Sequence, residues 1–138
     1  MLKIVLGIFV IAHGLVHTIL SIAPDPADPD AKPGAFFTAS ERSWLLHPLG
    51  LNTTVIQWIG IILVALATLG FVLAGLGIFG VAGLSAIWQT VAIVSSFVSL
   101  LLLMLFWHPW LPVGVLIDVS ILLSLIWAKW PPANLVGS

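Results

Sequence analysis

The sequence has no cysteine and few charged residues: four Lys and Arg and five Asp and Glu among 138 residues. Without cysteine, this chain alone cannot form a disulfide, a thiolate nucleophile or a cysteine-ligated iron–sulfur cluster. Charged residues make up 7% of the sequence, whereas soluble domains carry about a quarter. So few charges cannot build a water-soluble surface. The net charge of −1 also lacks the clustered basic face that nucleic acid requires, so we expect no nucleic-acid partner.

In place of charge, the sequence has long apolar stretches, with 61% hydrophobic residues and a mean hydropathy of +1.24. A helix needs about 20 mostly apolar residues to cross the ~30 Å hydrocarbon layer of a bilayer. Residues 2–22, 54–79, 85–107 and 111–130 meet this requirement. We therefore predict an all-α integral membrane protein, a single domain over residues 1–138 with the lipid bilayer as its main partner.

The connections predict how these helices are arranged. Gly80 to Gly83 and His108-Pro109-Trp110 are short turn-forming segments, and short connections force consecutive helices to lie antiparallel. We expect an up-down-up-down bundle of four transmembrane helices. The first linker, residues 23–53, is longer and opens with a proline-rich run that excludes helix.

Within this linker, Thr38 and Glu41 have the spacing of a capping box, in which each side chain satisfies a free amide at a helix start. They predict a short helix from about Ala39 to His47, lying along the membrane interface. Asn52 or Thr53 should then cap the second transmembrane helix.

Basic residues near the chain ends indicate an orientation. Lys3 and Lys129 lie at the end of the bundle that carries both termini, and basic residues favour the cytoplasmic side. We expect a multi-pass plasma membrane protein with cytoplasmic N and C termini. The opposite linker holds Lys32 and Arg42, so the two sides carry equal numbers of basic residues.

Small residues recur at helical spacing in three of the segments. Helices in lipid associate through close packing and interhelical hydrogen bonds, so such stripes mark contact faces. The alternative is that small residues are simply common in membrane helices. The residues that we expect to face inward are Gly7 and Gly14 in the first helix, Gly60, Ala67, Gly70, Ala74 and Gly77 in the second, and Ala92, Ser95 and Ser99 in the third.

Three ionisable side chains fall inside the apolar segments: His13, His17 and Asp118. With a rise of about 1.5 Å per residue, His17 and Asp118 should lie at the same depth, with His13 one turn deeper. A buried carboxylate in a bilayer needs a partner, so we predict that Asp118 accepts a hydrogen bond from His17, with His13 as a further candidate. Other polar side chains at the outer rim should complete a pocket: His47, His108, Glu41 and Arg42.

Several interpretations of this pocket remain open. Asp118 could be a structural tie between the first and fourth helices, or part of a functional site open to the outer face. His13, His17 and Asp118 would supply the three ligands of a 2-His-1-carboxylate iron site, but no further ligand stands nearby and we expect no metal. We expect no haem either, because two histidines from one helical turn cannot serve opposite faces of one ring unless a dimer supplies the second ligand.

The segment Gly7-Ile8-Phe9-Val10-Ile11-Ala12-His13-Gly14 resembles the first helix of the DoxX-like family of small four-helix bacterial membrane proteins, which carry a similar Ala-His-Gly and a glycine-rich second helix. This chain departs from that pattern in lacking an arginine at the start of the first helix, in having His17 where lysine is more usual, and in its longer linker. The family is associated with quinone-linked redox complexes and partner oxidoreductases, so the resemblance implies an accessory membrane subunit.

We therefore predict a non-enzymatic multi-pass membrane protein, an accessory subunit of a larger membrane complex, with a His/Asp pocket near the outer face. Its protein partners would be other membrane subunits or further copies of itself. The first alternative is a quinone- or small-molecule-binding redox protein that uses His13, His17 and Asp118. The second is a transporter of a small solute or of protons, which would have to be oligomeric because four short helices rarely enclose a pore.

Overall fold

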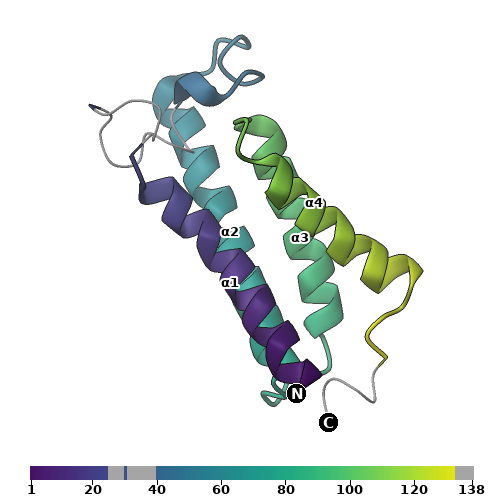
Figure 1. The fold of residues 1–138 in the computed structure, drawn as a ribbon. Coiled ribbons are helices and arrows are strands. Elements are labelled where there is room, and N and C mark those ends of the chain that lie inside the picture. Colours follow the sequence, from purple (N-terminus) through teal and green to yellow (C-terminus); the bar gives the residue numbers. More distant parts are fainter. Residues whose placement is uncertain (25–29, 31–39, 133–138) are drawn as a thin grey trace.

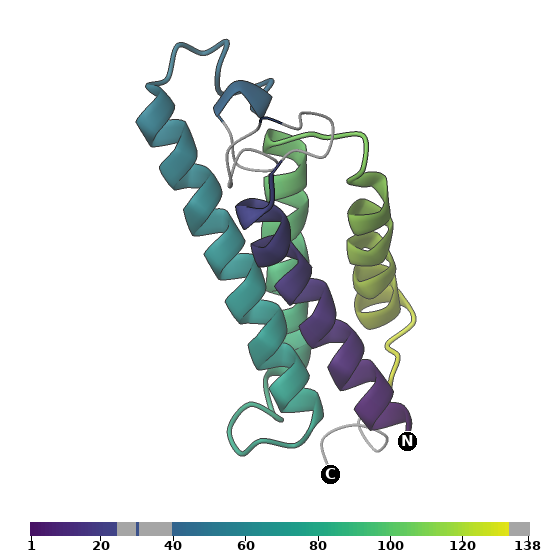
Figure 2. The same cartoon turned by 60° about the vertical axis from the view of Figure 1, so that its left-hand side comes forward.

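The structure, a computed structural model, describes residues 1–24, 30 and 40–132. Within these residues every regular element is helical, which confirms the predicted all-α class there. The elements are α1 (Leu2–Ile22), the 3-10 helix η1 (Ser40–Arg42), α2 (Thr53–Ile78), α3 (Trp88–Leu105), α4 (Pro112–Leu122) and the π-helical turn η2 (Leu123–Trp127) that continues α4. Successive long helices alternate in direction (Figures 1 and 2).

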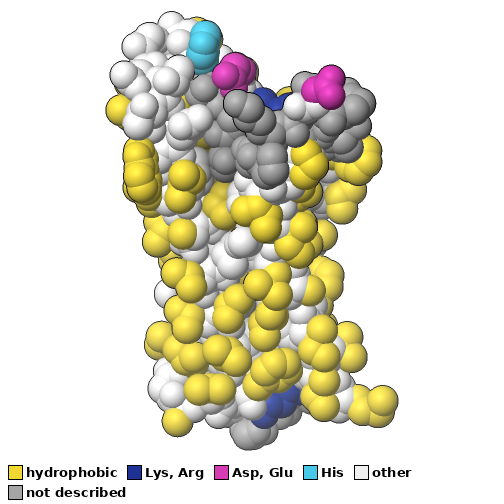
Figure 3. All heavy atoms as spheres, turned by 90° about the vertical axis from the view of Figure 1, so that its left-hand side faces the viewer, with side chains coloured by type: hydrophobic (Ala, Val, Ile, Leu, Met, Phe, Trp, Pro, Cys, Tyr) yellow, Lys and Arg dark blue, Asp and Glu magenta, His cyan; other side chains and the backbone are white. Residues whose placement is uncertain are grey.

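Three helices in the described part of the chain, α1, α2 and α3, are long and apolar enough to cross a membrane, whereas the apolar helix Pro112–Trp127 is shorter. Large apolar side chains are exposed along their outer faces, among them Leu66 and Leu69 on α2. On the face that Figure 3 shows, hydrophobic side chains cover the height of the molecule, and the visible charged side chains lie at its two ends. This distribution supports the prediction of a membrane protein with transmembrane helices, because only a lipid solvent tolerates such a surface.

The helix boundaries depend on local chemistry at each end. α2 begins directly after Asn52, whose side chain accepts a hydrogen bond from the Thr54 amide at 2.8 Å, so the predicted cap is confirmed. α3 is shorter than the predicted residues 85–107, because residues 82–87 form turns and Phe106 leaves helical geometry at φ −121° and ψ 64°. α4 passes into the π-helical turn after Leu122, well before residue 130.

The predicted interfacial helix from Ala39 to His47 is wrong where it can be compared. Thr38 and Ala39 lie outside the described residues, and the segment after them is a 3-10 helix of three residues followed by turns. The buried Ser43 hydroxyl accepts a hydrogen bond from the Leu46 amide at 3.3 Å, and such side-chain bonds compete with helical ones. Pro48 further disfavours helical geometry at the residue before it.

Trp44 connects this linker to the bundle through a hydrogen bond. Its indole N–H donates a hydrogen bond of 2.6 Å to the carbonyl of Met104, near the end of α3. The last four carbonyls of a helix have no partner within that helix. The tryptophan therefore satisfies one of them while holding the linker over the end of α3.

The predicted small residues lie where helices meet. A Cβ on Gly70 would lie 2.0 Å from Ser95 Oγ of α3, and one on Gly77 would lie 2.6 Å from Trp88 Cβ. A Cβ on Gly7 would reach the Phe79 ring. Residues Gly60, Ala67, Ala74 and Ala92 are buried as well.

Gly75, which the predicted stripe omits, makes a further close approach: its Cβ would meet Ile11 and the backbone oxygen of Gly7. The glycines of α2 therefore serve two faces. Gly75 lies against α1, while Gly70 and Gly77 lie against α3.

The buried apolar side chains form two clusters at different heights. One, toward the end of the bundle that carries the linker, includes Ile56, Leu102 and Phe106. The other includes Phe71 and Trp88, the latter only 6% exposed. The buried polar side chains of α1, α3 and α4 lie between these two clusters.

Candidate functional site

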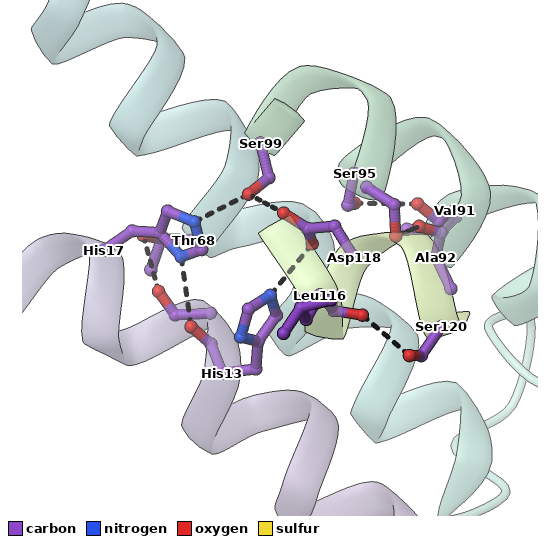
Figure 4. A network of polar contacts seen from close by, with 12 residues as sticks. His13, His17, Thr68, Val91, Ala92, Ser95, Ser99, Leu116, Asp118 and Ser120 are labelled. Atoms are coloured by element: carbon purple, nitrogen blue, oxygen red, sulfur yellow. Dashed lines mark hydrogen bonds and ion pairs between the residues drawn. The ribbon is translucent and has the colours of Figure 1, made fainter. Parts of the chain in front are cut away.

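A buried polar cluster joins three helices (Figure 4): His13 and His17 of α1, Ser99 of α3 and Asp118 of α4. His13 is 7% exposed, His17 4%, and Ser99 and Asp118 are fully buried. His13 Nε2 lies 2.9 Å from Asp118 Oδ1. Ser99 Oγ is hydrogen-bonded both to Asp118 Oδ2 at 2.5 Å and to His17 Nε2 at 2.7 Å.

The helical repeat of α1 places the two histidines on one face. Residues four apart are neighbours on a helix surface. The His17 ring donates a hydrogen bond from Nδ1 to the His13 carbonyl at 3.0 Å. The two rings meet edge-on, with centroids 5.1 Å apart. His17 is therefore held by its own helix on one side and by Ser99 on the other.

Phe71 of α2 packs against both histidines. Its ring centroid lies 4.8 Å from that of His13, edge-on, and 6.1 Å from that of His17, roughly parallel. This approach depends on Gly14, because a Cβ there would lie 2.7 Å from Phe71 Cβ. The glycine after His13 thus lets α2 come close enough to fix the histidine.

The structure brings His13, His17 and Asp118 together, as predicted, but the histidine that bonds Asp118 is not the predicted one. The prediction that His17 bonds directly to Asp118 is wrong: His13 makes that bond, and Ser99 stands between His17 and the carboxylate. The four residues from His13 to His17 amount to about 6 Å along the helix axis. Depths counted along parallel helix axes do not apply here, because the helices are inclined to one another (Figures 1 and 2).

Ser99 is the member of the polar cluster that the sequence identified only as a packing residue. Ser95 and Ser96, on the same helix, donate to the carbonyls of Val91 and Ala92 one turn earlier, and Ser120 of α4 does the same to Leu116. These three hydroxyls stay within their own helices, as serine commonly does. Ser99, in contrast, bonds to side chains of α1 and α4, and its signal was its depth beside Asp118.

The other four predicted pocket residues lie apart from the cluster, at the linker end of the bundle. His47 and Glu41 are exposed and Arg42 is half-buried. His108 is buried, and its Nδ1 accepts a hydrogen bond from the Trp110 amide at 3.2 Å. The predicted single pocket is therefore two separate groups, one at the rim and one at mid-height.

Burial lowers the pKa of His108 below its ordinary value, and the nearby positive charge of Arg42 lowers it further. A histidine with a lower pKa in the folded state stabilises the fold fully above its unfolded pKa of about 6.5 and loses that contribution as the pH falls. We expect the melting temperature to fall on acidification from about pH 7.5 to about pH 5.5. In His108→Asn, whose side-chain oxygen can still accept the Trp110 amide but cannot titrate, the fall should be smaller. Equal falls in both proteins would contradict this account.

Two cavities are lined by residues of α1 and α4. The first, of about 370 Å³, is lined by His13 and His17 and otherwise by apolar residues and Gly114. The second, of about 350 Å³, lies toward η2. Phe9, Val113 and Ile117 line both, so the two cavities are adjacent, and together they are called the crevice below. Along α1 it extends from Leu6 to Leu20, about 21 Å at the helical rise.

His13 presents a nitrogen to this crevice. Its Nε2 bonds Asp118, while its Nδ1 has no hydrogen-bond partner among the described residues (Figure 4). No fully buried side-chain nitrogen or oxygen in that part of the chain lacks a partner. Nδ1 therefore keeps accessible surface, and it is the cavity lined by His13 that it can reach.

The same residues have the composition of a metal site. His13, His17 and Asp118 each offer one ligand atom, and these atoms lie within 4.8 Å of one another. Two imidazoles and a carboxylate suit a divalent transition metal. In the structure, however, these atoms are joined by hydrogen bonds to each other and to Ser99, so a cation would have to replace the hydrogens that they share.

Comparisons with protein-family models, with curated proteins and with solved structures found no match for this chain. The likeness to the DoxX-like family therefore stays a prediction. Function must be derived from the cluster and the crevice themselves.

Proposed function

We propose that this protein crosses the plasma membrane four times and binds a small amphiphilic molecule, taken from the lipid phase, in the crevice between α1 and α4. The molecule's apolar body would lie along the crevice and its polar end would meet His13. One observation carries this proposal: His13 Nδ1, an imidazole nitrogen with no hydrogen-bond partner among the described residues, belongs to a side chain that lines a largely apolar cavity.

The proposal takes α4 as the fourth span. The helix from Pro112 to Trp127 is about 24 Å long at the ordinary rise, somewhat less than the hydrocarbon thickness. Exposed tryptophans at its two ends, Trp110 and Trp127, suit headgroup depth, and a bilayer thins locally around a short span. Lys3 and Lys129 then lie on the cytoplasmic side with the termini.

The chemistry of His13 indicates the polar group that it would bind. Because Asp118 Oδ1 is hydrogen-bonded to Nε2 at 2.9 Å, a neutral His13 carries its hydrogen on Nε2 and a lone pair on Nδ1. That nitrogen accepts a hydrogen bond from a hydroxyl but not from a carbonyl or an ether. A hydroquinone or another alcohol with an apolar tail fits. The cavity volumes lie within the ordinary range for small-molecule sites, about 300–1,000 Å³.

We further propose that the protein holds this molecule without transforming it, as an accessory subunit working with other membrane proteins or with further copies of itself. The resemblance to the DoxX-like family supports this role, since that family is associated with quinone-linked complexes. The residues that carry the resemblance, His13 and Gly14, are the ones that fix the imidazole beside the crevice.

Thermal stability in lipid nanodiscs, measured anaerobically, tests the binding. We expect an alkyl-tailed hydroquinone to raise the melting temperature of the wild type. At a hundredfold excess over its Kd, the ligand should add about 2.7 kcal/mol to the free energy of unfolding. The dimethyl ether of the same molecule, equal in shape but without a donor, should stabilise it much less.

Two tryptophan variants on α4 supply the control. Ile117→Trp fills the crevice and should abolish the stabilisation, because Ile117 lines both cavities. Val119→Trp should retain it, because Val119 is exposed and lines neither. Equal stabilisation of the wild type and Ile117→Trp, or by hydroquinone and ether, would contradict the proposal.

A further inference from the structure

The polar cluster has one hydrogen too few to make all of its hydrogen bonds unless an extra proton is present. His17 Nδ1 lies 3.0 Å from the His13 carbonyl, and a carbonyl only accepts, so Nδ1 carries a hydrogen. A neutral His17 then has a bare Nε2, which can only accept. The single hydrogen of the Ser99 hydroxyl would have to serve both His17 Nε2, at 2.7 Å, and an ionised Asp118, at 2.5 Å.

One additional proton completes the chain in either of two arrangements. In the first, a protonated Asp118 donates from Oδ2 to Ser99, and Ser99 donates to His17 Nε2. In the second, a doubly protonated His17 donates from Nε2 to Ser99, and Ser99 donates to an ionised Asp118. A proton on His13 would not help, because the gap lies between His17 and Asp118.

We propose that the cluster holds one labile proton, which passes between Asp118 and His17 through the Ser99 hydroxyl. In the forward step the Asp118 O–H bond breaks as its proton moves to Ser99 Oγ, while the Ser99 O–H bond breaks as that proton moves to His17 Nε2. No other atom is gained or lost, and the cluster is neutral overall in both arrangements. Such neutrality suits a site at membrane depth, where an unpaired charge is costly.

This proton site does not depend on the crevice or on its ligand. His17, Ser99 and Asp118 can hold the proton without any other molecule. The two short contacts of Ser99 are within the range of strong O–H···O and N–H···O bonds. The full burial of Ser99 and Asp118 keeps water from taking over the bridge. The proton can therefore move between α4 and α1 without a change in the backbone.

Solid-state NMR in bilayers at neutral pH can count this proton, with carbon-labelled aspartate and nitrogen-labelled histidine. The sequence holds four histidines and four aspartates, so the spectra are simple. Asp118→Asn and His17→Gln identify the two signals. We expect the fractional protonation of the Asp118 carboxyl and that of His17 Nε2 to sum to one. A sum of zero, with an ionised Asp118 beside a neutral His17 or with a divalent metal ion on both, would overturn the proposal, as would a sum of two.

A pair of variants at Asp118 gives an independent test. Asparagine carries its own hydrogens, so its amide can donate to Ser99 while its oxygen accepts from His13, and the chain is complete without the extra proton. We expect Asp118→Asn to melt close to the wild type and Asp118→Leu, which provides neither group, to melt well below it. An asparagine variant as unstable as the leucine variant would show that the site requires an ionised carboxylate and holds no shared proton.

Discussion

Replacing Asp118 with leucine should destabilise the protein by about 1–3 kcal/mol, the cost of leaving buried hydrogen-bonding groups without partners. The variant strands the Nε2 hydrogen of His13 and one contact of Ser99. His13→Leu should cost a similar amount, because it strands Asp118 Oδ1. The double variant should cost less than either alone, since it removes both ends of the His13–Asp118 bond. Reversible unfolding in detergent would measure the four free energies.

A second double-mutant cycle, on His17 and Asp118, distinguishes the direct His13–Asp118 bond from the connection through Ser99. His17 reaches Asp118 only through Ser99, so the coupling free energy between His17→Leu and Asp118→Leu should be smaller than that between His13→Leu and Asp118→Leu. Double-mutant cycles in membrane proteins give at most about 1.7 kcal/mol. Additive costs for the His13 pair would mean that α1 and α4 are not joined at this bond.

Replacing Gly70 with leucine should separate α2 from α3. Even a Cβ at this position would lie 2.0 Å from Ser95 Oγ and 3.0 Å from Ser95 Cβ, and α3 also carries Ser99. Overpacking costs about 1–3 kcal/mol, and we expect the upper part of that range because the obstacle lies close to the backbone. The melting temperature in detergent should fall steeply.

A neighbouring residue and a compensating change control this prediction. Leu69 is 61% exposed on the outer face, so Leu69→Ala should change the melting temperature little. Combining Gly70→Ala with Ser95→Gly should recover most of the stability lost in Gly70→Ala alone. A Gly70→Leu variant as stable as the wild type would show that this face of α2 does not pack against α3.

The sequence was sufficient to predict those features that depend on composition and on local chemistry. The apolar runs located α1 and α2 to within one residue of the structure, because the length needed to cross a bilayer constrains them. The Asn52 cap followed from an amide that needed an acceptor. Likewise, the cost of a charge in lipid was enough to predict that His13, His17 and Asp118 would meet.

The partners within the cluster could not be predicted, for two physical reasons. The inclination of the helices to one another cannot be derived from a linear rise per residue, so depth alone could not decide between His13 and His17. In addition, a serine in a membrane helix can satisfy itself on its own backbone, as Ser95 and Ser96 do. Nothing in the residue type distinguished Ser99 from these two.

The linker shows the same difficulty for a different reason. Thr38 and Glu41 have helix-start spacing, but the segment that follows is held by contacts remote in sequence, chiefly the bond from Trp44 to the Met104 carbonyl. Tertiary anchoring of this kind outweighs a local preference worth about 1 kcal/mol.

The bond between His13 of α1 and Asp118 of α4 is central to both proposals. Solid-state NMR can measure the dipolar coupling between His13 Nε2 and the Asp118 side-chain carboxyl carbon in lipid bilayers. We predict a strong coupling, as for two groups in direct hydrogen-bond contact at 2.9 Å, and a weaker one from His17. A stronger coupling to His17, or none to either histidine, would contradict the account.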